Sequence, residues 1–126
     1  MEIAILGYRR ERRDEVEEAL RFCLGRDAPI RLRQYGMEEP LYNPAPEETA
    51  AVFVIVDDAK ALIAANKAAQ WGKSLPLVIV SNHPQYAMEG IRLKVRHYIL
   101  FPLEQEDIRE SLRRIGLEVA RNWEES

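Results

Sequence analysis

The sequence predicts an α/β fold in which a parallel five-stranded sheet lies between two layers of helices. Two continuous apolar runs rich in valine and isoleucine, Ala51–Val56 and Leu77–Val80, are typical of central parallel strands, which are covered on both faces. Segments of helical periodicity separate most of the strand-like runs, and this alternation implies right-handed crossovers within one parallel sheet. Because the chain of 126 residues shows no internal repeat or linker, we expect a single domain over residues 1–126.

Three further runs complete the predicted sheet. Glu2–Leu6 is mostly apolar and ends at Gly7, and Ile30–Tyr35 alternates apolar with polar residues. His97–Leu100 ends just before Pro102, which has no backbone N–H to donate to a strand ladder.

Helical patterns fill all but one of the connections. The first helix is expected to end at Gly25, and a shorter helix runs from Tyr86 to about Lys94. The connection Met37–Thr49 holds three prolines in an acidic stretch, so its helix is predicted to be short or replaced by a loop. The apolar stripes of the first and last helices are Val16, Leu20, Cys23 and Leu24, and Ile108, Leu112, Ile115 and Val119.

Composition excludes several classes of function. The formal net charge of −3 leaves no broad basic surface, so nucleic acid is not an expected partner of this segment. Cys23 is the one cysteine, which excludes an internal disulfide or a multi-cysteine zinc site and favours a cytoplasmic location. The longest apolar runs have strand length, far below the roughly 20 residues of a membrane span.

The carboxyl ends of the predicted strands carry few groups suited to catalysis. A phosphate-binding loop needs several glycines after the first strand. In this sequence a single glycine, Gly7, is followed by Tyr8 and charged residues, so a phosphate-binding loop is not expected. The two histidines have no partner at metal-ligand spacing, and a pair of Ser81 with His83 lacks an orienting third group. We therefore expect no enzyme activity and no metal site.

Asp57 is the candidate residue with the clearest chemistry. It directly follows a buried strand at the edge of the sheet where ligands bind in doubly wound folds, so its carboxylate is placed to accept a phosphoryl group. Alternatively, Asp57 and Asp58 leave the strand and cap the next helix. The residues alone leave both interpretations open.

The segment Pro76–Leu103 resembles receiver domains of bacterial response regulators, the CheY-like superfamily. It is most similar to receivers that precede a LytTR DNA-binding domain, in which the fourth strand ends in Ser or Thr, a Tyr-Ala-x-Glu helix follows, and the fifth strand reads Tyr-Leu-Leu-Lys-Pro. The first and third strands resemble the family moderately, whereas Gly36–Thr49 does not. The resemblance implies a three-layer, flavodoxin-like sandwich with strand order 2-1-3-4-5.

Matched residue by residue, the family's phosphorylation site is only partly present. Asp57 matches the phosphoacceptor aspartate, Ser81 the hydroxyl residue that contacts the phosphoryl group, and Tyr98 the aromatic switch on the fifth strand. The acidic pair that holds Mg²⁺ is replaced by Gly7 and Tyr8. The conserved lysine of the family's motif is replaced by Phe101.

These substitutions remove both cations that phosphoryl transfer to a carboxylate requires. The resemblance therefore implies a pseudo-receiver without bound Mg²⁺ or another cofactor, which regulates by protein contact and independently of phosphorylation. In the related regulators a DNA-binding output domain follows, so the chain is expected to be the N-terminal part of a transcription regulator. Two alternatives remain: an atypical phosphoacceptor that uses Asp57, and a sensor that binds a small ligand near residues 36–49.

The family also implies an interaction surface. Receivers commonly dimerise or contact partners through their fourth helix, fifth strand and fifth helix, and no membrane contact is expected. In this sequence that surface carries charges of both signs, which suit a protein partner or a homodimer. Its residues are Glu89, Arg92, Lys94, Arg96, Glu110 and Arg113.

Overall fold

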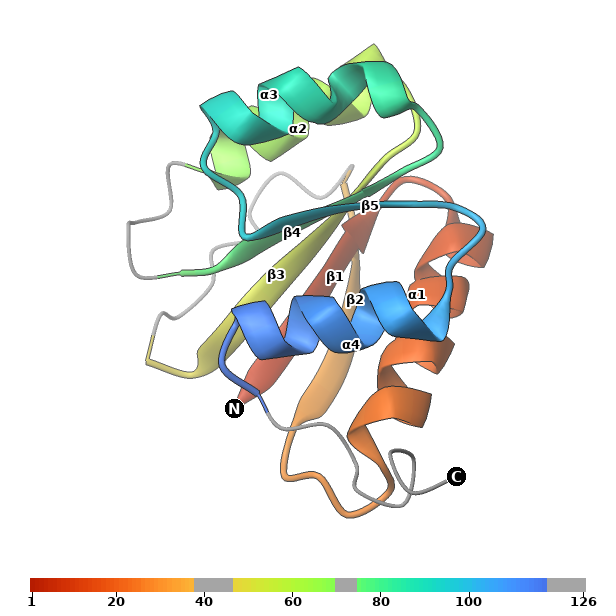
Figure 1. Ribbon diagram of the computed structural model, residues 1–126, viewed down its shortest axis with the longest axis vertical. Helices are drawn as coiled ribbons and strands as arrows, with labels where there is room; N and C mark the ends of the chain where they lie inside the picture. Colours follow the sequence, from red (N-terminus) through yellow and green to blue (C-terminus); the bar gives the residue numbers. More distant parts are fainter. Residues whose placement is uncertain (38–46, 70–74, 118–126) are drawn as a thin grey trace.

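The structure is a computed structural model that describes residues 1–37, 47–69 and 75–117. Its centre is a five-stranded parallel sheet in the order β2-β1-β3-β4-β5, which confirms the predicted fold class and strand order. Helices cover both faces of this sheet (Figure 1). The strands are β1 (Glu2–Gly7), β2 (Arg31–Gly36), β3 (Thr49–Val56), β4 (Leu77–Ser81) and β5 (His97–Leu100).

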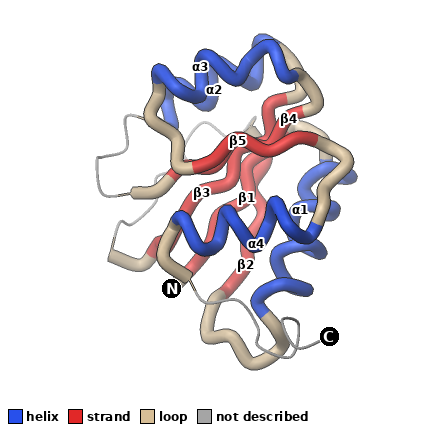
Figure 2. The backbone as a smooth tube through the Cα atoms, viewed as in Figure 1, coloured by secondary structure: helices blue, strands red, loops and turns tan. Residues whose placement is uncertain are grey.

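Figure 2 shows helices on both sides of the sheet, and among the described residues two helices pack on each face. The helices α1 (Arg10–Leu24) and α4 (Gln105–Arg114) bury their apolar stripes against one face. On the other face lie α2 (Ala59–Ala68) and the short α3 (Ala87–Arg92), which a 3₁₀ turn at Pro84–Tyr86 precedes. None of the described helices is both long and apolar enough to cross a membrane.

The alternation of side chains in β1 and β3 divides the core into two halves. Ile3 and Ile5 point toward the α1–α4 face, whereas Ala4 and Leu6 point toward the α2–α3 face. The buried residues of α2 are all alanines, Ala61, Ala65 and Ala68, and these small side chains let the helix lie close to the sheet. Burial on both faces explains why the central strands are continuous apolar runs.

The last helix is shorter than its apolar periodicity predicts. It ends at Arg114 because Gly116 adopts a positive φ of 86°, and the Leu117 N–H then donates to the Leu112 carbonyl at 2.8 Å. The predicted continuation to Val119 falls outside the described residues. By contrast, the end of α1 at Gly25 is confirmed.

Between β2 and β3 the described residues contain no helix. Most of the proline-rich connection, residues 38–46, lies outside the described part of the chain, so its short helix or loop stays a prediction.

Candidate functional site

The register of the sheet gathers the predicted site residues at one edge. Val56 of β3 is paired with Ser81 of β4, and Ser81 is paired with Leu100 of β5. Because all five strands are parallel, Asp57 and Phe101 leave their strands at this same carboxyl edge. The end of β1 also lies here, since Leu6 pairs with Val54.

Ser81 is fully buried and its hydroxyl is already engaged. The Ser81 Oγ donates to the Val56 carbonyl at 2.6 Å and accepts the backbone N–H of His83 at 3.0 Å. The hydroxyl therefore joins the end of β3 to the turn that follows β4. A phosphoryl group at this edge would have to compete with these bonds for the Ser81 hydroxyl.

His83 links three parts of the edge, a role that sequence reasoning missed because it considered this ring only as a metal ligand or a base. Its Nε2 lies 2.7 Å from the Asp57 carbonyl, so Nε2 carries the proton and donates. The Nδ1 atom then accepts from Gln85 Nε2 at 3.2 Å. The Tyr98 hydroxyl donates to the His83 carbonyl. No pattern in the sequence marks a histidine that bridges two loops.

Tyr98 packs inward between α3 and the sheet. A Cβ atom built on the buried Gly90 would lie 3.1 Å from Tyr98 Cδ2, so the glycine leaves room for the tyrosine ring. Burial raises the pKa of the Tyr98 hydroxyl above its usual range. The hydroxyl therefore stays protonated and acts as a donor at neutral pH.

The two aspartates after β3 have different roles. Asp58 is the N-cap of α2, and its Oδ1 accepts the Ala61 N–H at 2.9 Å, which confirms the capping interpretation for this residue. Asp57 does not cap the helix. Its Oδ1 is buried and has no hydrogen-bond partner among the described residues.

At the end of β1, an arginine occupies the space beside Gly7. Arg13 Nη1 donates to the Gly7 carbonyl at 2.7 Å, and its Nε donates to Gln34 Oε1 at 3.1 Å. A Cβ on the buried Gly7 would lie 3.0 Å from Ile55 Cδ1 and 3.2 Å from Arg13 Cγ. The backbone at this position is thus closely packed, with a guanidinium against its carbonyl.

Two aromatic rings flank the edge on opposite faces of the sheet. Tyr8 packs on the α2–α3 side, with the Lys60 ammonium 4.7 Å from its ring centroid. Phe101 packs on the α1–α4 side, with the Arg12 guanidinium 4.2 Å from its ring centroid. Both cations contact a ring face and satisfy the geometry of cation–π interactions. Among the described residues, no group of three or more His, Cys, Asp or Glu side chains is arranged to hold a metal ion.

Solved structures share the fold of this chain, although no family model and no curated protein matches it. A response regulator receiver protein from Pseudoalteromonas atlantica aligns with a TM-score of 0.73 at 10% identity and covers 91% of this chain and 96% of its own. A candidate pilus assembly protein (cpaE) from Burkholderia thailandensis gives 0.67 at 19% identity, covering 92% and 98%. NtrX from Brucella abortus gives 0.70 at 18% identity, covering 90% of this chain and 26% of NtrX.

The chain has a receiver-like fold. At these identities the comparisons establish the fold alone, so the roles of Asp57, Ser81 and Tyr98 depend on their geometry. That geometry brings Ser81 and Tyr98 into one hydrogen-bonded centre through His83, and it places the Asp57 carbonyl in the same centre.

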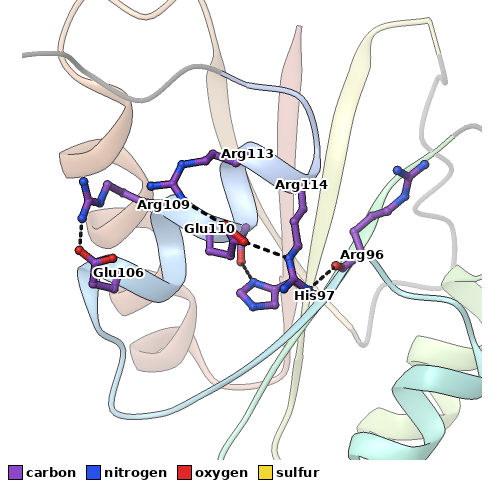
Figure 3. Close-up of polar contacts among 8 residues, drawn as sticks. Arg96, His97, Glu106, Arg109, Glu110, Arg113 and Arg114 are labelled. Atoms are coloured by element: carbon purple, nitrogen blue, oxygen red, sulfur yellow. Dashed lines mark hydrogen bonds and ion pairs between the residues drawn. The ribbon is translucent and has the colours of Figure 1, made fainter. Parts of the chain in front are cut away.

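On the predicted interaction surface of this receiver-like fold, several charges are already paired. Glu89 and Arg92 of α3 are 2.7 Å apart, and Arg92 also donates to Asn66 of α2 at 3.1 Å. On α4, Glu110 contacts Arg113 at 2.9 Å and Arg114 at 3.3 Å (Figure 3). These arginines hold the pKa of the Glu110 carboxyl below its usual range by hydrogen bonding.

The same surface contains a contact between β5 and α4. His97 Nδ1 lies 2.6 Å from Ser111 Oγ, and Arg114 Nη1 donates to the Arg96 carbonyl at 3.3 Å (Figure 3). Burial, followed by the nearby charge of Arg114, lowers the pKa of His97. Arg96 and Lys94 are exposed beside this contact.

Proposed function

We propose that this chain is a non-enzymatic, receiver-like regulatory domain of bacterial two-component signalling, with a degenerate phosphorylation site. It acts in the cytoplasm by contact with other proteins and does not depend on phosphorylation. The observation that carries this proposal is the contact of the Arg13 guanidinium with the Gly7 carbonyl, at the position where the family has its acidic pair.

A Mg²⁺ ion does not fit this arrangement. The ion requires near-octahedral oxygen coordination, and proteins supply it through carboxylates. At the end of β1 there is no carboxylate, the Gly7 carbonyl already accepts from Arg13, and an acidic side chain at Gly7 would meet Ile55. The positive charge of Arg13 further disfavours a cation beside Gly7. We therefore propose that the domain works without Mg²⁺ or another cofactor.

The second missing cation supports the same conclusion. Phosphoryl transfer to a carboxylate depends on positive groups that neutralise the developing charge, because both reactants are anionic. Where the family has lysine, Phe101 instead packs its ring beneath Arg12. The Arg12 guanidinium is also 3.0 Å from Glu15, so its charge is partly compensated.

Treatment with acetyl phosphate and Mg²⁺, followed by intact-protein mass spectrometry, tests the proposal. We expect no aspartyl-phosphate adduct in the wild-type chain. The matched control is Asp57→Ala, which removes the candidate acceptor and leaves the Asp58 cap in place. A stoichiometric adduct that is lost in Asp57→Ala would overturn the proposal.

That same outcome would establish the second candidate function, an atypical phosphoacceptor. One observation favours it: the Asp57 Oδ1 atom is buried and has no hydrogen-bond partner among the described residues. A small-ligand sensor that uses residues 36–49 is the third hypothesis, and most of that segment lies outside the described residues.

We further propose that the contact surface comprises α3, β5 and α4. These elements and the loop before β5 carry six cations and four carboxylates, an excess of positive charge in a chain whose net charge is −3. An acidic protein partner therefore fits this surface better than a symmetric homodimer, in which like charges would face each other. Charge reversal by Arg96→Glu should weaken partner capture without changing the far-ultraviolet circular dichroism spectrum.

Two settings for such a domain are supported by different observations. The resemblance of Pro76–Leu103 to receivers that precede LytTR domains favours a transcription regulator, and NtrX illustrates that this fold occurs within a longer chain. The likeness to candidate pilus assembly proteins from Burkholderia thailandensis and Sinorhizobium meliloti favours a role in pilus assembly instead. The reading frame downstream of Ser126 distinguishes the two, because the first setting requires a DNA-binding domain there.

A further inference from the structure

Large apolar side chains are exposed on the outer surface of α2 and α3. Ile63 of α2 is 61% exposed, and Met88 and Ile91 of α3 are 73% and 71% exposed. The hydrogen bond from Arg92 to Asn66 joins the two helices beside them. We call Ile63, Lys67, Met88, Ile91 and Arg92 the α2–α3 patch. Exposed apolar side chains that cluster in this way mark interaction surfaces more often than isolated ones do.

The charge at the α2–α3 patch is positive. Lys67 lies one helical turn after Ile63, and Lys60 lies one turn before it. Among the described residues, no carboxylate lies within ion-pair distance of Lys67, while Arg92 is paired with Glu89. Lys67 is therefore available to a negatively charged partner.

A groove of about 380 Å³ lies between α1 and the start of α4. Its apolar part includes Phe22, which is 55% exposed, and its rim carries carboxylates and no cation. Among the described residues, no cation lies within ion-pair distance of Glu18 or Glu104, whereas Glu15 is paired with Arg12. We call this site the acidic groove, and its lining is Glu15, Glu18, Ala19, Phe22, Pro102, Leu103, Glu104 and Gln105.

The patch and the groove belong to opposite faces of the sheet. The helices α2 and α3, which carry the patch, cover one face of the sheet, and α1 and α4 cover the other (Figure 1). Residues of α1 and of the start of α4 line the acidic groove. One molecule cannot bring them together, whereas a second copy presents each surface to its complement. Both combine exposed apolar side chains with an unpaired charge, positive on one surface and negative on the other.

We propose that copies of this chain associate head to tail, with the α2–α3 patch of one copy in the acidic groove of the next. A two-fold arrangement would place each surface against itself and oppose like charges. The head-to-tail contact is heterologous, so every added copy leaves one patch and one groove open. Assembly therefore continues beyond two copies. This contact does not depend on the phosphorylation of Asp57, so it stands or fails separately from the proposed function.

Sedimentation velocity over a range of concentrations tests this association. We expect the wild-type weight-average mass to rise beyond that of a dimer and to fall as salt is added, because the unpaired charges are exposed and screened. Two single charge reversals, Lys67→Glu and Glu18→Lys, should each weaken association by about tenfold, since each opposes like charges at the contact. Both residues are exposed, so the reversals leave the core unchanged.

Mixing the two variants provides the decisive measurement. The Glu18→Lys variant has a lysine in the acidic groove as well as Lys67 in the α2–α3 patch. The Lys67→Glu variant has a glutamate in the patch as well as Glu18 in the groove. An equimolar mixture should therefore recover association that neither variant shows alone. The matched control is Arg31→Glu, which makes the same charge change on an exposed residue of β2, outside the patch, the groove and the surface of α3, β5 and α4.

Several results would overturn the proposal. These are a monomeric mass at every concentration, an assembly that stops at two copies, a mixture without recovery, and an effect of Arg31→Glu equal to that of Lys67→Glu. A monomer that instead binds phosphatidylserine vesicles through Lys67 would assign the patch to a lipid surface and would overturn it as well.

Discussion

At the carboxyl edge of the sheet, the ends of β3 and β4 form a hydrogen-bonded polar centre, whereas the ends of β1 and β5 are closed by arginine side chains. In the centre, Ser81 bonds both the Val56 carbonyl and the His83 N–H, and His83 reaches the Asp57 carbonyl. Toward the flanks, the consecutive residues Arg12 and Arg13 of α1 diverge. One covers the Phe101 ring and the other contacts the Gly7 carbonyl.

This difference separates the part of a receiver-like site that maintains the fold from the part that performs chemistry. The central hydrogen bonds tie loops to strands and require neither a metal ion nor a phosphoryl group. In the pseudo-receiver that we propose, packing at the flanking positions takes the place of the cations that phosphoryl transfer needs. The hydrogen bonds of the centre do not depend on those cations, so the proposal allows the centre to persist for structural reasons.

The largest effect is expected for Gly7→Ala. The new methyl group would lie 3.0 Å from Ile55 Cδ1 and 3.2 Å from Ile55 Cβ, so we expect a loss of about 2 kcal/mol in the free energy of unfolding. The control is Gly36→Ala at the paired position of β2, where a Cβ meets only Arg13 Nη1 at 3.4 Å. Urea denaturation measures both. Equal losses would show that the flank is not closed by packing at Gly7.

The next effect tests the centre through Ser81→Ala. This change leaves the His83 N–H and the Val56 carbonyl without their buried partner, which should cost about 1–2 kcal/mol in the free energy of unfolding. Asn82→Ala, at the exposed neighbouring residue, should change stability by less than about 0.5 kcal/mol. If both variants unfold at the wild-type urea concentration, the hydrogen bonds of Ser81 do not stabilise the centre.

The centre and the flanks also differ in how far the sequence predicts them. Strand order and the burial of Ala51–Val56 follow from local patterns, because a strand covered on both faces must be apolar throughout. The sequence shows that Gly7 and Phe101 differ from the residues of the family's motif. It does not show that Arg13 contacts the Gly7 carbonyl or that Arg12 covers the Phe101 ring. Their contacts depend on how α1 lies across the sheet, which no local pattern encodes.

Local signals failed at two further places. The apolar stripe of α4 continues past the residue at which the helix ends. The periodicity of apolar residues does not show where a helix stops, and here Gly116, with its positive φ, sets the end. His83 gave no signal, since its bridging role requires loops after two strands to be adjacent. The sequence also did not show which of Asp57 and Asp58 caps the helix, because that depends on the residue at which α2 begins.

A smaller effect is expected for Tyr98→Phe. The ring stays packed beside Gly90, and only the hydroxyl that donates to the His83 carbonyl is lost. We expect a decrease of about 1 kcal/mol in the free energy of unfolding, measured with urea. Tyr35→Phe is a matched control, because it removes a hydroxyl that donates to Glu2 Oε2 at 2.9 Å and takes no part in the hydrogen bonds of Ser81 and His83. A much larger loss in Tyr98→Phe than in the control would show that the hydroxyl connects the whole centre.

The smallest effect concerns pH and the histidine at the contact between β5 and α4. Burial lowers the pKa of His97 from its ordinary value of 6.5, so below that pH the unfolded chain binds more protons than the folded chain. Stability should therefore fall as pH decreases from about 6.5 toward the lower folded pKa, with a slope below about 1.4 kcal/mol per pH unit. His97→Gln should remove this slope between pH 7 and 5. An unchanged slope in His97→Gln would mean that the contact between β5 and α4 is not the source of the pH dependence.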